Sequence, residues 1–118
     1  MKIDILGTPY DLVYKDYQND PLFEKLSICG YTDSVEHVIC ICNIGTFPDF
    51  EDETEEYCKK YERGILRHEI IHAFLNESGL QDSASVFNAA WVKNEEMVDW
   101  MSLQLPKIVE ACKAVDAM

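Results

Sequence analysis

The segment from Thr54 to Asn76 constrains the fold more than any other part of the chain, because it reads as one long helix. Its second half is apolar nearly all round and leaves little polar surface except Arg67 and one short polar motif. The apolar side chains of this half are Ile65, Leu66, Ile70, Ile71, Phe74 and Leu75. Gly79 follows as a helix stop. A helix of this kind is buried, so the rest of the chain must pack around it.

The polar motif in this helix is His68-Glu69-Ile70-Ile71-His72, which has the pattern HExxH. Residues four apart lie one above the other on a single face of an α-helix. His68 and His72 can therefore both reach one Zn²⁺ ion. Glu69 lies beside them, where its carboxylate can accept a proton from a water molecule on the metal. The spacing predicts a zinc site with Glu69 as the general base.

A catalytic zinc site needs a third protein ligand and an open coordination position. No histidine follows His72, and the remaining one, His37, lies upstream on a predicted strand. The later segment 94–99 (NEEMVD) offers carboxylates, and both Glu95 and Glu96 are candidates. At about 100° per residue, Glu95 borders the apolar stripe of its helix, whereas Glu96 points nearly opposite. We therefore predict Glu95 as the third ligand, with Glu96 as the alternative.

Asp99 follows Glu95 by one helical turn and lies on the same face. From there it can accept a hydrogen bond from the free ring N–H of a ligating histidine, which fixes the tautomer of that ring. The same acidic residues also suit an ordinary solvated helix start with Asn94 as its cap. Both interpretations stay open at this point.

The charge balance limits the partners that the chain can have. Its 118 residues include 22 acidic and 10 basic side chains, for a formal net charge of −12. Nucleic-acid binding needs clustered Lys and Arg, so we expect no nucleic-acid partner; the acidic balance is compatible with a basic protein or peptide substrate. No apolar run approaches membrane-spanning length, and no signal peptide is visible, so we expect no membrane association. Five cysteines without a disulfide-scaffold rhythm favour reduced thiols and a cytoplasmic location.

The first 48 residues are typical of two β-hairpins. The four β-prone runs are residues 2–6, 10–14, 27–31 and 37–43. Gly7 marks the first turn, and Thr32-Asp33-Ser34 is predicted as the second. Residues 38–42 (VICIC) are apolar throughout, which predicts a strand buried on both faces. Cys40 and Cys42 share one face of it, and because no second cysteine pair follows, a cysteine-bound metal is disfavoured.

Helices are predicted after the polar motif. Residues 86–92 and 94–105 read as helical, and Pro106 is expected to break the second, leaving a final amphipathic helix at residues 107–117. The apolar residues of this tail are expected to pack on the body of the protein, and Trp91 and Trp100 are expected in the core.

The element order indicates an α+β fold, with a small N-terminal antiparallel sheet packed on a buried HExxH helix and on C-terminal helices. We expect a single domain over residues 1–118. Residues 1–48 form its sheet region, residues 49–80 its active-site helix, and residues 81–118 the glutamate helix and the C-terminal helix.

HExxH followed by a glutamate in the context NExxxD resembles the gluzincins, the zinc peptidases that include thermolysin. The stretch 94–106, with a carboxylate, an amphipathic helix and then a proline, is similar to small phage and mobile-element peptidases of the ImmA/IrrE type. The resemblance covers about residues 60–106. It implies a zinc cofactor, Glu69 as general base and Asp99 as the partner of His68. The zinc ligands that it implies are His68, His72 and Glu95.

The resemblance also implies a strand, expected at residues 37–43, whose edge aligns an extended peptide by β-augmentation. The ImmA/IrrE pattern includes a separate helix-turn-helix or sensor domain, which these 118 residues lack. That departure argues against a DNA-reading or regulatory role by the same route.

The reaction expected of such a site is peptide-bond hydrolysis, with water activated by the zinc ion and Glu69. A second oxyanion donor is usual, and His37 and Tyr31 are the candidates. The main alternative is a catalytically silent zinc-binding protein of phage type with a regulatory or interaction role, because a short chain has little left to build a deep cleft. A chance HExxH in a metal-free helical protein is the third possibility.

Overall fold

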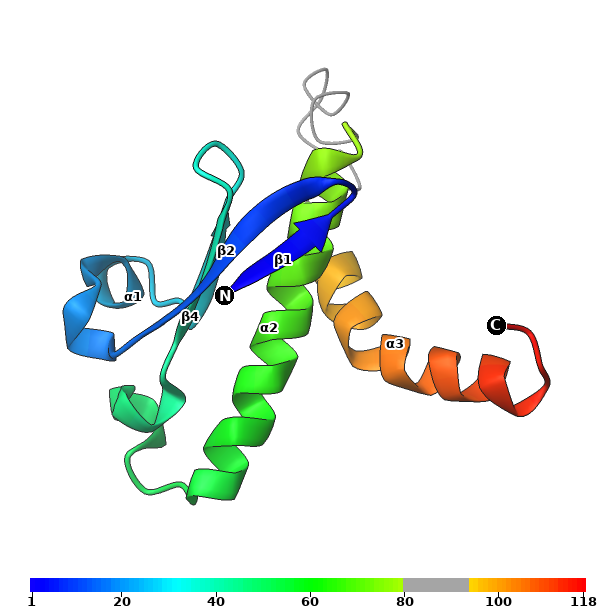
Figure 1. Ribbon diagram of the computed structural model, residues 1–118. Helices are drawn as coiled ribbons and strands as arrows, with labels where there is room; N and C mark the ends of the chain where they lie inside the picture. The colour runs from blue at the N-terminus through cyan, green and yellow to red at the C-terminus, as the bar shows by residue number, and fades with distance from the viewer. Residues whose placement is uncertain (80–93) are drawn as a thin grey trace.

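The computed structural model describes residues 1–79 and 94–118, and its architecture is α+β, as predicted (Figure 1). The strands are β1 (Lys2–Ile5), β2 (Thr8–Lys15), β3 (Gly30–Asp33) and β4 (Val38–Cys42). The helices are α1 (Pro21–Lys25), α2 (Glu55–Glu77) and α3 (Glu95–Ala114), and 3₁₀ turns lie at Tyr17–Asn19, Ile44–Thr46 and Pro48–Phe50. The helix predicted over residues 86–92, and Trp91 with it, lies outside the described residues.

The sheet is mixed, which corrects the predicted antiparallel sheet. Both expected hairpins form, because β1 pairs with β2 and β3 pairs with β4 in antiparallel fashion. However, β2 and β4 pair in parallel, with Val13 opposite Cys40, so the strand order is β1-β2-β4-β3. A parallel pair needs a crossover of about a dozen residues or more, and the segment that contains α1 and β3 supplies it. Hairpin patterns are local, and they carry no information about how two hairpins join.

The second hairpin turns later than predicted. β3 continues through Thr32 to Asp33, and the Asp33 carboxylate then accepts hydrogen bonds from the backbone N–H groups of Val35 and Glu36, both at 3.0 Å. This Asx turn starts the reversal at Asp33. Thr32 therefore belongs to the strand, and its hydroxyl reaches Glu69 of α2.

β4 is the centre of the core. All of Ile39, Cys40, Ile41 and Cys42 are fully buried, which confirms the prediction of a strand buried on both faces. The two isoleucines pack with β1, β2 and α2, while the two thiols lie on the other face in a cluster around Phe23. β4 pairs on both sides and has no free edge, so it cannot be the predicted peptide-aligning strand. The edge on this side of the sheet belongs to β3.

α2 matches its predicted extent to within one residue. The Thr54 hydroxyl caps its start by accepting a hydrogen bond from the Tyr57 N–H at 3.1 Å, and Gly79, with φ of +82°, follows its end. Its second half lies between the sheet and α3 (Figure 1). Ala73 packs in the sheet cluster and Ile71 in the α3 cluster, so the helix is buried from two sides.

α3 is one continuous helix with Pro106 inside it, which corrects the predicted break and the separate final helix at residues 107–117. A proline within a helix leaves the carbonyl four residues earlier without its N–H partner. Here that carbonyl belongs to Ser102, and Nε of Arg67 in α2 donates a hydrogen bond to it at 3.0 Å. α2 thus satisfies the backbone group that the proline frees, and the helix continues.

The second half of α3 extends away from the rest of the molecule (Figure 1). Ile108 is 45% exposed, Val115 is 75% exposed and Trp100 is 57% exposed. The predicted packing of the tail and the predicted core position of Trp100 are therefore wrong. The first half of α3 contacts α2 through an apolar cluster that includes fully buried Val98. The apolar stripe of α3 extends beyond this contact along the helix. In the described residues, no helix combines the length and the apolar character needed to cross a membrane.

Glu77 ties the C-terminal end of α2 to the sheet. The Tyr10 hydroxyl donates to Oε1 of Glu77 at 2.7 Å, and the Thr8 hydroxyl donates to Oε2 at 2.9 Å. His37 Nε2 lies 3.6 Å from Oε1. The hydrogen bond from Tyr10, followed by that from Thr8, lowers the pKa of Glu77 below its ordinary value. These partners keep a negative charge at a helix end whose dipole disfavours it.

We predict that Tyr10→Phe lowers the melting temperature at neutral pH, because Glu77 loses its principal hydrogen-bond donor. A folded-state pKa below the unfolded value means that the stabilisation is complete above the ordinary glutamate pKa of about 4.3 and disappears as the pH falls through the lower folded value. Thermal unfolding in buffers on both sides of that window measures the difference from the wild type, with half-exposed Tyr14→Phe as the control. A difference in melting temperature between Tyr10→Phe and the wild type that stays constant through the acid range would contradict this role of Glu77.

Candidate metal centre

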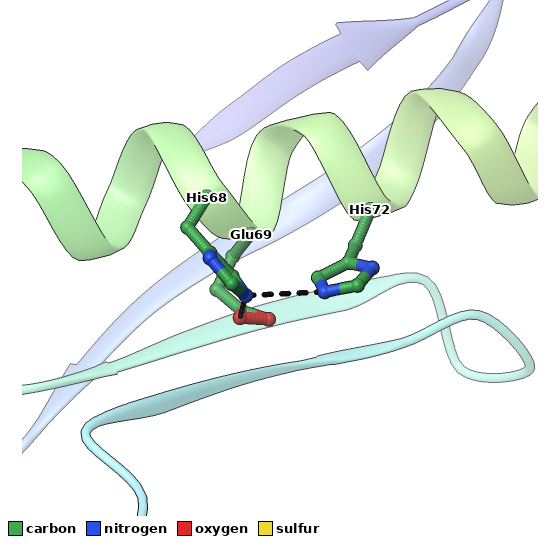
Figure 2. A group of neighbouring side chains, drawn as sticks. All are labelled: His68, Glu69 and His72. Atoms are coloured by element: carbon green, nitrogen blue, oxygen red, sulfur yellow. Dashed lines mark hydrogen bonds and ion pairs between the residues drawn. The ribbon is translucent and has the colours of Figure 1, made fainter. Parts of the chain in front are cut away.

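His68, Glu69 and His72 project from α2 toward the hairpin of β3 and β4 (Figure 2). Their potential ligand atoms all lie within 4.8 Å of one another. The two Nε2 atoms are 3.1 Å apart, although the ring planes are inclined by 66°. The helix therefore brings the two imidazoles to one point, as the i, i+4 spacing predicts.

Glu95 reaches both histidines from the first turn of α3. Its Oε2 lies 3.0 Å from His68 Nε2 and 3.1 Å from His72 Nε2, so the three atoms form a nearly equilateral triangle. Ligands of a tetrahedral zinc ion, with bonds of about 2.0–2.1 Å, lie about 3.3 Å from one another. The triangle is close to the size that three such ligands require. Of the two acids left open by the sequence, Glu95, and not Glu96, contacts the histidines.

The start of α3 serves as a capped helix start as well. The Asn94 side chain accepts a hydrogen bond from the Met97 N–H at 3.2 Å, which is the cap that the sequence suggested. Three residues after Glu95, Val98 is fully buried against Ile71 and Leu75 of α2. The cap and this apolar contact together hold Glu95 beside the histidines.

Asp99 sets the tautomer of His68. Its Oδ1 lies 2.6 Å from His68 Nδ1, and since a carboxylate can only accept, we assign the proton to Nδ1. In the neutral ring, Nε2 then carries a lone pair. That lone pair faces the carboxylate of Glu95 and the ring nitrogen of His72. Electron-pair donors this close repel one another unless a proton or a cation lies between them, and this donor set fits a divalent cation.

Glu69 is buried beside this triangle, with only 6% of its surface exposed. Its Oε2 lies 4.0 Å from His68 Nε2, and Oε1 lies 3.2 Å from the Thr32 hydroxyl, which is also 3.0 Å from the backbone carbonyl of Glu69. Burial raises the pKa of Glu69, against the opposite effects of His68, His72 and the Thr32 hydroxyl. A raised pKa makes a carboxylate a better proton acceptor.

Thr32 is a site residue that sequence reasoning missed. The segment 32–34 reads as a turn, and nothing in that pattern indicates a strand residue whose side chain crosses to a helix. The contact depends on the position of the Asx turn at Asp33 and on the packing of β3 against α2.

Neither predicted oxyanion donor is directed at the site. Tyr31 lines the neighbouring cavity, but its hydroxyl donates to Asp20 at 2.6 Å. His37 lies in the turn before β4, with φ of +57°, and its ring packs against Tyr10 beside Glu77. In these positions, Tyr31 and His37 make contacts that stabilise the fold.

Two cavities meet at His68. One, of about 620 Å³, lies between β3 and the histidines, and the other, of about 510 Å³, follows the N-terminal half of α2. Gly30 lets β3 approach the helix, since a Cβ atom there would come within 2.8 Å of the Ile65 side chain and 3.1 Å of the Cys40 carbonyl. β3 is an edge strand of the sheet, so one side of its backbone borders the first cavity without a strand partner in the described residues.

The chain matches no protein-family model, no curated protein and no solved structure. Its function has to be inferred from the geometry of its own residues.

Proposed function

We propose that the protein is a zinc-dependent peptidase that hydrolyses peptide bonds in a protein or peptide substrate. The triangle formed by Nε2 of His68, Nε2 of His72 and Oε2 of Glu95 carries this proposal. Three protein ligands are typical of catalytic zinc, whereas structural zinc is closed by four. A buried second carboxylate, Glu69, adds nothing to metal binding alone, and its place beside the triangle favours catalysis.

The chain's own residues would divide the work as follows. His68, His72 and Glu95 hold the metal, and Asp99 keeps His68 in the tautomer that leaves Nε2 free to bind. Zn²⁺ bound there would lower the pKa of a water molecule to about 7 and polarise the substrate carbonyl. Glu69 accepts the proton of that water and delivers it to the leaving amine.

The free edge of β3 is the proposed place for an extended substrate. A peptide that adds to this edge as a further strand would use the backbone groups of β3 for its hydrogen bonds. β3 and α2 run in the same direction here, because Gly30 lies against Ile65 and Thr32 against Glu69. A peptide bound along β3 would therefore pass over Glu69 and the histidines. The central strand β4 could not bind a peptide in this way, because both of its edges are paired.

We propose a reducing, cytoplasmic compartment for the protein. All five cysteines are free thiols, and three of them are buried in the core. Buried unpaired thiols are typical of proteins in compartments where disulfides do not persist.

Elemental analysis of the purified protein should find about one zinc ion per chain. Glu95→Ala should lose most of this zinc after dialysis, since it removes one corner of the triangle, whereas Glu96→Ala should retain it. A wild-type protein without zinc, or equal losses in the two variants, would remove Glu95 from the ligand set.

Glu69→Gln should bind zinc like the wild type and lose peptide hydrolysis by about 10²-fold or more, because the amide cannot accept the proton. Cleavage of a broad peptide library, with and without a chelator, measures this. Zinc binding without any cleavage by the wild type would favour the alternative of a catalytically silent zinc-binding protein.

Thr32→Val should leave zinc binding intact and change the pH dependence of cleavage. The Thr32 hydroxyl lowers the pKa of Glu69, so its removal should raise that pKa and move the acid limb of the pH–rate profile to higher pH. Ser34→Ala, which alters the same cavity, serves as the control. An acid limb that stays in place would show that Thr32 does not act on Glu69.

A further inference from the structure

α3 carries Glu95 and Asp99, so its position on α2 decides whether these carboxylates reach the histidines. We propose that Arg67 is a positioning residue of this site: by bonding the Ser102 carbonyl that Pro106 leaves free, it fixes the register of α3 on α2. This inference rests on the proposed zinc site and names a residue that sets the affinity of the site without touching the metal.

The contact between Arg67 and Ser102 is buried and specific. Ser102 is only 4% exposed, and its carbonyl and its hydroxyl both bond to α2. Its carbonyl accepts from Arg67 Nε at 3.0 Å, and its hydroxyl donates to the Gly64 carbonyl at 3.1 Å. Gly64 and Arg67 are three residues apart and therefore lie on the same face of α2.

Pro106 removes the donor that the Ser102 carbonyl would otherwise have within α3. In an ordinary helix the Ser102 carbonyl would accept from the N–H of residue 106, but proline has none. The carbonyl therefore depends on a donor from another element, and Arg67 supplies it. A different placement of α3 would separate this carbonyl from its donor, and buried carbonyl groups without a partner are rare.

Apolar packing alone does not fix the register as strictly. The cluster of Val98 with Ile71 and Leu75 is held by the hydrophobic effect, which is non-directional. A slip of one helical turn moves α3 by about 5.4 Å, which is further than the spacing of 3.0 Å between Glu95 and His68. The directional bond from Arg67 opposes that slip.

The bond and the site share one face of α3. Ser102 follows Asp99 by three residues and Glu95 by seven, or about 4.5 Å and 10.5 Å along the helix axis. On α2, Arg67 directly precedes His68. Arg67 contacts the backbone of α3 and neither of the two carboxylates, so it acts on the site through the placement of the helix.

Arg67→Met tests the proposal, because it keeps a long apolar stem and removes the donor. Zn²⁺ affinity, measured by competition with a chromophoric chelator, should fall about tenfold, as for other residues that orient zinc ligands. Arg63→Met makes the same change at an exposed position four residues earlier on α2 and should leave the affinity unchanged. Equal affinities of Arg67→Met and the wild type would overturn the proposal.

Pro106→Ala supplies the second arm of the experiment. An alanine at this position restores the N–H that the Ser102 carbonyl lacks, so Arg67→Met should cost less than about threefold in zinc affinity in that background. An equal loss in both backgrounds would mean that Arg67 acts through charge or bulk, and the proposal would fail. If Arg67→Met does not fold, Arg67→Leu gives the same comparison, because it also lacks a donor; a loss is expected in the Pro106 protein alone.

Urea unfolding in the presence of a chelator separates this inference from the proposed function. The proteins compared are the wild type, Arg67→Met, Pro106→Ala and the double variant. The metal-free cycle should show the same coupling between positions 67 and 106, because the bond does not need zinc. A wild-type protein that binds no zinc would overturn the proposed function, whereas zinc binding without coupling would overturn the role of Arg67 alone.

Discussion

The crossing of α2 and α3 is the constraint on which the candidate centre depends. α2 supplies two imidazoles and the buried Glu69, but Glu95 and Asp99 come from a helix separated from α2 in sequence. Apart from the contacts of Glu95 and Asp99 with the histidines, the two helices are joined by one small apolar cluster and by the bonds of Ser102 to Gly64 and Arg67. Because Glu95 is on α3, a metal ion bound by Glu95 and the histidines would also stabilise the docking of α3 on α2.

The strand order of the sheet determines which strand faces the histidines of α2. β4 is buried and paired on both sides, so it serves as the scaffold, and β3 is left as the edge strand beside α2. Gly30 allows this edge to lie close to the helix, and Thr32 reaches the carboxylate of Glu69. At the far end of α2, Glu77 binds the first hairpin through Tyr10. The histidines of α2 therefore lie between the edge of β3 on one side and α3 on the other.

The sequence predicted those features that depend on local spacing. The extent of the helix around His68 and its glycine stop were predicted, as were the strand buried on both faces and the shared face of His68 and His72; the periods of 3.6 and 2 residues account for most of this. Helical phase also favoured Glu95 over Glu96, but its approach to the histidines depends on how two helices dock. Long-range features were missed or wrong: the parallel pairing of β2 with β4, the edge position of β3, and the continuity of α3 through Pro106. Pro106 illustrates the reason, because a local rule ends the helix there and only a donor from α2 makes it continue.

X-ray absorption spectroscopy at the zinc edge tests the central claim most directly, since it reports the atoms around the ion itself. The account predicts nitrogen and oxygen neighbours at about 2.0–2.1 Å, with the multiple-scattering signature of two imidazoles, and no sulfur. Sulfur neighbours at about 2.3 Å would place the ion among the cysteines of the core, and a first shell without imidazole would separate it from His68 and His72. Either result would contradict a metal centre at the crossing of α2 and α3.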